Sequence, residues 1–191
     1  MEQGEAVRRS LCVLLVLLGT AAATTRGRSE SLWSVGGLVQ GGVSLTALQS
    51  KLVALAAGTV GVVVGRRLLA GLGGDYLLSP VFDSSAGTGH RLGMWYGGPV
   101  VGYRLPLSKR LDLTPTALFG IGRFKELGDT VSPDRIGVVE PEIDMSYCYS
   151  PDAPVALGLG AAYRLVFKSN YFAGSEASGL RGVLFLRGRF F

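Results

Sequence analysis

Cysteine and histidine are scarce in this chain of 191 residues, which has two cysteines and one histidine. Cys12 lies in an apolar N-terminal segment that we expect to be removed as a signal peptide. The remaining chain has a single cysteine, Cys148, and cannot form an intramolecular disulfide. One histidine and one cysteine are too few for a zinc site built from these residue types. We therefore expect no disulfide, no metal centre and no bound cofactor.

The chain also lacks an apolar run long enough for a transmembrane helix, although 48% of its residues are hydrophobic. The best candidate, residues 52–65, has three glycines and many β-branched residues, and it is shorter than the roughly 20 residues that such a helix needs. Only helices and closed barrels satisfy every backbone group within lipid, so a barrel is the remaining membrane fold. The net charge of +5 is spread over strands rather than gathered with aromatic residues, which argues against nucleic-acid binding.

The N-terminus has the pattern of a secretory signal peptide. Arg8 and Arg9 precede an eight-residue apolar run at 11–18, and three alanines follow at 21–23. This pattern predicts cleavage before Thr24. We expect a signal peptide at 1–23, a short N-terminal periplasmic segment at 24–30, and a β-barrel domain at 31–191.

The last thirteen residues alternate in chemical character with a period of two. Leu180, Leu184 and Leu186 fall on one face of an extended strand, and Arg181, Arg187 and Arg189 fall on the other. The chain then stops on two phenylalanines. An apolar outward face, a charged inward face and an aromatic rim are typical of a strand in a transmembrane β-barrel.

Eight segments have strand character, and most are long enough to cross a bilayer at a tilt. Their connections alternate between three tight turns and four longer polar loops, one of which we expect at 42–50. The pattern predicts an all-β fold, an eight-stranded antiparallel up-and-down transmembrane β-barrel with short periplasmic turns and longer external loops. The expected strands are 31–41, 51–64, 68–79, 91–105, 111–124, 136–149, 155–167 and 179–191.

Nearly all charges in the middle of these strands fall on one face, with Arg91 and Arg123 as exceptions close to the loops, where they could reach lipid headgroups. The lumen of an eight-stranded barrel is just wide enough to be filled by side chains, so these charges must pair there. The facing of the first two strands stays open. The predicted lumen charge network consists of Asp75, Arg104, Asp112, Glu140, Glu142, Asp144, Arg164, Arg181, Arg187 and Arg189.

Three segments, 95–115, 138–166 and 179–191, resemble a family of small bacterial outer-membrane β-barrel proteins without an assigned activity. The shared features are Tyr-Gly-Gly-Pro at 96–99, Glu-Pro-Glu at 140–142, Tyr-Arg at 163–164 and the aromatic C-terminus. The resemblance implies the outer membrane of a Gram-negative bacterium and a C-terminal strand recognised by the barrel-assembly machinery. Two features depart from the family: Thr59 stands where an arginine is common, and Phe190 rather than Phe191 is in phase with the apolar face.

The leading functional hypothesis is an integral outer-membrane protein with a structural or surface-binding role, monomeric and surrounded by outer-membrane lipid. A narrow channel for ions or small solutes is one alternative, with the lumen pairs acting as a gate. A lipid-modifying hydrolase is another, with His90 as base and Asp83, Ser84 and Ser85 in the same loop. Glu140 and Glu142 could also form an acid/base pair, but a filled lumen leaves no entrance for a substrate.

Overall fold

The computed structural model describes residues 34–48, 51–78, 81–83, 90–127, 134–150, 153–167 and 178–190. The expected signal peptide and the segment 24–30 lie outside these residues. No helix in the described part is long and apolar enough to cross a membrane. The strands are β1 (Val35–Leu48), β2 (Lys51–Val64), β3 (Leu68–Leu77), β4 (Val81–Asp83), β5 (His90–Tyr103), β6 (Leu105–Pro106), β7 (Leu111–Leu127), β8 (Asp134–Tyr147), β9 (Val155–Phe167) and β10 (Gly179–Phe190).

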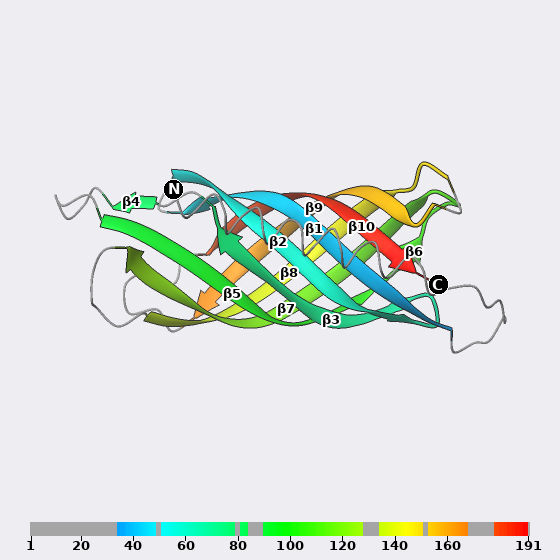
Figure 1. The fold of residues 1–191 in the computed structure, drawn as a ribbon, viewed down its shortest axis with the longest axis horizontal. Helices are drawn as coiled ribbons and strands as arrows, with labels where there is room; N and C mark the ends of the chain where they lie inside the picture. The colour runs from blue at the N-terminus through cyan, green and yellow to red at the C-terminus, as the bar shows by residue number, and fades with distance from the viewer. Residues whose placement is uncertain are drawn as a thin grey trace, which may run out of the picture.

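Eight long strands close into an antiparallel barrel, as the alternating sequence predicted (Figure 1). Each long strand pairs with its neighbour in the chain, β3 pairs with β5 and β5 with β7, and β1 pairs with β10 to complete the circle. The two short strands add to this cylinder, β4 beside β5 and β6 beside β7. Closure leaves no long strand with an unpaired edge, which is what a barrel needs in lipid.

One end of the barrel has tight turns, and we call it the short-turn end. In Figure 1, β1 begins there and β10 ends there, beside the turn from β2 to β3. Gly65 and Arg66 have φ of 60° and 61°, and the Arg67 amide donates to the Val64 carbonyl over 3.2 Å. Positive φ at both central residues matches the right-handed twist of the flanking strands. The opposite end, where β1, β3, β7 and β9 finish, is the loop end.

The expected long loop at 42–50 is wrong, because β1 continues to Leu48 and only residues 49–50 separate it from β2. Residues 42–48 of the expected loop therefore lie within the strand. Gly42 allows β1 to lie close to β10, because a Cβ at this position would lie 2.3 Å from the carbonyl oxygen of Leu184. Beyond it, Ser44 and Thr46 are buried while Val43 and Leu45 are exposed, so the alternation continues.

The barrel is apolar outside and mixed inside. Outward side chains on several strands are more than half exposed, among them Leu72, Ile121 and Leu180. This is the arrangement expected for a lipid-facing surface. Inside, the loop end of the lumen is filled by hydrophobic side chains, which we call the apolar layer: Leu48, Val53, Leu55, Leu77, Met94, Phe124, Ile136, Val138 and Val166.

Candidate functional site

The candidate site is the polar middle of the lumen, where successive strands present every second residue inward. Glu140, Glu142 and Asp144 come from one face of β8 because side chains alternate along a strand. Pairing of β3 with β5 sets Asp75 directly opposite Tyr96. Arg181 reaches the same level from β10, on the other side of the lumen. The narrow circle of eight strands thus brings residues distant in sequence into contact.

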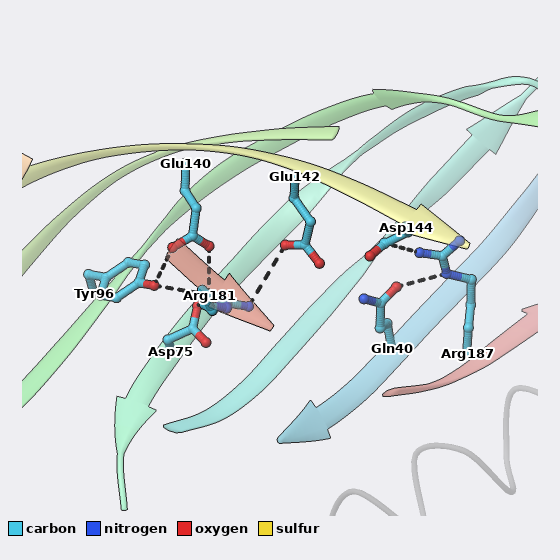
Figure 2. A network of polar contacts seen from close by, with 8 residues as sticks. All are labelled: Gln40, Asp75, Tyr96, Glu140, Glu142, Asp144, Arg181 and Arg187. Carbon is cyan, nitrogen blue, oxygen red and sulfur yellow. Dashed lines mark hydrogen bonds and ion pairs between the residues drawn. The ribbon is translucent and has the colours of Figure 1, made fainter. Parts of the chain in front are cut away.

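Arg181 is the centre of the largest group, which we call the central cluster and which consists of Asp75, Tyr96, Glu140, Glu142 and Arg181 (Figure 2). Its Nη1 donates to Asp75 Oδ2 over 2.7 Å and to Glu140 Oε1 over 2.6 Å. The side chains of all three are 3% exposed or less. Nη2 lies 3.8 Å from Glu142 Oε2, so this one guanidinium faces three carboxylates.

Tyr96 completes the central cluster with its hydroxyl. It accepts from Arg181 Nη1 over 3.0 Å and donates to Glu140 Oε2 over 2.7 Å. The phenol therefore links the arginine to the second oxygen of Glu140. Hydrogen bonds to charged groups contribute more than neutral ones, so these contacts strongly restrain the side chains that they join.

Arg187 forms a second group nearer the short-turn end. It pairs with Asp144 through Nη2, donates from Nε to Gln40 over 2.7 Å, and donates from Nη1 to Thr114 over 3.1 Å. Its guanidinium carbon also lies 4.8 Å from the centre of the Phe185 ring. These contacts hold the guanidinium across the lumen, as the right side of Figure 2 shows for Gln40 and Asp144.

Asp112 pairs with two arginines at the short-turn end. Arg104 Nη2 donates to both of its carboxylate oxygens over 3.0 and 3.1 Å, and Arg189 Nη1 donates to Oδ2. Arg189 also donates from Nη2 to the sulfur of Cys148, which is a buried free cysteine. This end of the lumen therefore carries an excess of positive charge, whereas the central cluster carries an excess of carboxylates.

Arg164 is fully buried between the central cluster and the apolar layer. Its Nη2 lies 3.5 Å from Thr46 Oγ1, and its guanidinium carbon is 6.0 Å from the centre of the Tyr96 ring. Thr46 in turn donates to the Leu180 carbonyl over 2.9 Å. All ten residues of the expected network thus lie inside the barrel or at its mouth, gathered around Arg181, Arg187 and Asp112, with Arg164 beside the Tyr96 ring.

Several interior residues were missed from the sequence. Gln40 and Thr46 belong to β1, whose facing was left open and whose second half was taken for a loop. Tyr96 enters the sequence analysis only as part of the Tyr-Gly-Gly-Pro motif, and the buried Asp134 lies outside the expected strands. The alternation Leu38, Gln40, Gly42, Ser44, Thr46, Leu48 was the signal that could have placed the two β1 residues.

Little open space remains around these groups. The cavity between the central cluster and Arg187 has a volume of about 30 Å³, which is room for about one water molecule. Asp75 Oδ1, Glu142 Oε1 and Asp144 Oδ1 lie in this region without a hydrogen bond from another described residue. Among the described residues, no three His, Cys, Asp or Glu side chains are arranged to hold a metal ion. The chemistry of this site is ion pairing within a filled lumen.

Comparisons with known proteins find similarity in structure but not in sequence. No protein-family model and no curated protein sequence matches the chain. Among solved structures, Neisserial surface protein A superposes with a TM-score of 0.57 at 12% identity, over 82% of this chain and 96% of that one. The chain has the fold of a small transmembrane β-barrel.

A second similar structure is Ail, the attachment invasion locus protein of Yersinia pestis, in complex with the heparin analogue sucrose octasulfate. It matches with a TM-score of 0.54 at 10% identity, over 82% of this chain and 98% of that one. Ail alone matches with a TM-score of 0.50. These likenesses confirm, at the level of fold, the resemblance to small outer-membrane barrels that the sequence motifs indicated.

Proposed function

We propose that the chain is a monomeric integral protein of the outer membrane of a Gram-negative bacterium, with a structural or surface-binding role and a closed lumen. The observation that carries this proposal is the combination of an apolar outer face with two successive barriers inside. The apolar layer fills the loop end of the lumen. Nearer the short-turn end, Arg181 and Arg187 on β10 form ion pairs with Asp75 on β3 and Asp144 on β8. A rigid barrel of this kind is a support for whatever its loops bind.

A channel function is the weaker alternative. An ion crossing the lumen would have to pass the apolar layer and then separate buried ion pairs. Removing one partner of a buried pair costs about 3–5 kcal/mol, so spontaneous opening is rare. The cavity between these groups has a volume of about 30 Å³, which is too small for a hydrated ion.

A surface-binding role is supported by two features. The long connections all leave the loop end, while the short-turn end carries tight turns, which is the usual asymmetry of outer-membrane barrels. The two similar structures bear the names of a surface protein and an attachment protein. We infer that the loop end faces outward and that any ligand specificity resides in the loops.

Two partners follow from placement in the membrane. Outer-membrane lipid surrounds the apolar face. The barrel-assembly machinery recognises β10, which presents Leu180, Leu184 and Leu186 to the outside. No nucleic-acid partner is proposed.

Planar-bilayer recording tests the closed lumen. We expect purified wild-type protein, reconstituted at high copy number, to give no discrete current steps. The double variant Phe124→Ala/Arg181→Ala removes a large side chain from each barrier and serves as the control that an open lumen is detected. Regular current steps from the wild type would overturn the proposal and favour a channel.

A hydrolase function is the remaining alternative. The side chain of His90 and both Ser84 and Ser85 lie outside the described residues. We propose a non-enzymatic role, and lipid profiling of cells that carry His90→Ala tests it. Unchanged lipids are the expected result; a lost lipid product would show an enzyme.

A further inference from the structure

Two arginines lie side by side on the outer face of the barrel near its loop end. Arg123 on β7 pairs directly with Arg135 on β8, and both side chains are exposed. Lys125 lies two residues further along the same face of β7 and is also exposed. Like charges directly opposite each other in a sheet repel, so this arrangement is unfavourable unless an anion lies between them.

No ion pair between described side chains involves Arg123, Lys125 or Arg135. The ion pairs between described side chains that Arg104, Arg181, Arg187 and Arg189 form lie in the lumen and at the short-turn end. Asp134 is the neighbour of Arg135 in sequence, but it points to the opposite face and is only 4% exposed. The outer face therefore holds three positive charges within two residues of each other on neighbouring strands.

A groove of about 580 Å³ runs beside the two arginines. Its walls are mostly apolar and come from Trp95, Ile121 and Phe167 on three different strands. Gly137 leaves space in its floor, since a Cβ there would meet Phe167 only at an ordinary 3.9 Å. We call this feature, with Arg123 and Arg135 at its rim, the arginine groove.

The height of the arginines on the barrel fits a membrane interface. Arg123 lies twelve residues along β7 from Leu111 at the short-turn end. At ~3.3 Å per residue and a strand tilt of ~40°, this corresponds to roughly 30 Å along the barrel axis. The hydrocarbon core of a bilayer is about 30 Å thick. If Leu111 lies at one interface, Arg123 and Arg135 lie at the other, where lipid phosphates are found.

We propose that the arginine groove binds a lipid of the external leaflet that carries a phosphate monoester. Its phosphate lies between Arg123 and Arg135, and one of its acyl chains lies along Trp95, Ile121 and Phe167. Arginine suits this role because its planar fork donates two parallel hydrogen bonds to a phosphate. A phosphate monoester carries about −1.5 to −2 charges at neutral pH, which matches three cations better than the single charge of a phospholipid diester. The inference rests on the proposed placement in the outer membrane.

Native mass spectrometry of the full chain in an uncharged detergent tests this site. The probes are bis-phosphorylated lipid A, the same lipid without phosphates, and phosphatidylglycerol. We expect lipid A to bind at least tenfold more tightly than either other probe. Arg123→Gln and Arg135→Gln should each weaken lipid A binding about tenfold, since a charge-assisted hydrogen bond contributes at least that factor.

Two further variants separate charge from shape. Gly137→Leu fills the groove without changing charge, and we expect it to lower lipid A binding about as much as one arginine substitution. Lys109→Gln/Arg110→Gln removes two exposed charges at the short-turn end and should leave binding unchanged. The gel mobility of unboiled protein, measured on every variant, shows whether the barrel is intact.

The outcomes are distinct. Loss of binding in the groove variants with an intact barrel supports the site. Equal binding of all three probes, equal loss in the short-turn control, or preference for phosphatidylglycerol would refute it while leaving the barrel assignment in place. A dimer that forms through this face and excludes lipid would also refute it. A chain that never shows barrel mobility would refute the proposed function instead.

Discussion

Arg181 is the residue whose removal should damage the folded barrel most. One guanidinium faces Asp75, Glu140 and Glu142, and its side chain is 3% exposed. In the variant Arg181→Met, a side chain of similar length replaces the cation, and three carboxylates remain in the lumen without it. Breaking a buried pair in this way costs about 3–5 kcal/mol, because an uncompensated charge stays buried.

The assay is urea unfolding of protein refolded into lipid vesicles, followed by tryptophan fluorescence and by gel mobility. With a urea dependence of about 2 kcal/mol per M, a loss of about 4 kcal/mol lowers the midpoint by roughly 2 M. Arg110→Met makes the same substitution at an exposed site and should shift the midpoint little. Adding Asp75→Asn and Glu140→Gln to Arg181→Met should recover part of the loss.

The reasoning fails if Arg181→Met and Arg110→Met have the same midpoint. It also fails if the neutralised triple variant is less stable than Arg181→Met alone, because the loss would then not come from unpaired carboxylates. Either result would mean that the lumen is solvated enough to hold free charges. The closed interior would then be wrong as well.

Three other predictions concern packing, the β2–β3 turn and the free cysteine. Gly158→Ala should destabilise the barrel by about 1–3 kcal/mol, since its Cβ would lie 2.2 Å from Phe185 Cζ. Phe185→Leu should relieve only part of this loss, because the Cβ would also lie 2.9 Å from the Met145 carbonyl oxygen. Gly182→Ala meets nothing within 4 Å and should be neutral in the same urea unfolding. Arg66→Val should lower the unfolding midpoint more than Arg66→Asn, because φ is 61° and asparagine tolerates that region; equal midpoints would contradict the turn. Cys148 is 4% exposed, so a maleimide should label it only after boiling, and rapid labelling of the folded barrel would contradict its placement inside.

Much of the barrel followed from the period of two in the sequence. In β8 and β10, charged residues alternate with large apolar ones, so one face had to be inside and the other in lipid. Closure by pairing of β1 with β10 followed from the even strand count and the absence of a helical span. These features depend on local pattern alone, which a single sequence contains.

The first two strands and the partners in the lumen were harder to predict. β1 has the small and polar residues Gly42, Ser44 and Thr46 on its inward face, so it lacks the contrast between charged and large apolar residues that marks the later strands. Which acid meets which arginine depends on strand tilt and register, which periodicity does not determine. The apolar layer was missed for a related reason: its members come from seven strands and meet only after the barrel closes.

The proposed function, the lipid site and the paired charges all depend on the chain forming a closed barrel in the outer membrane. The most direct test is the gel mobility of the full-length chain from isolated outer membranes, with and without boiling. We expect the protein in this fraction, as a compact band that moves to a different apparent mass after heating. A soluble protein, or a band that boiling leaves unchanged, would contradict the barrel and with it the paired charges inside.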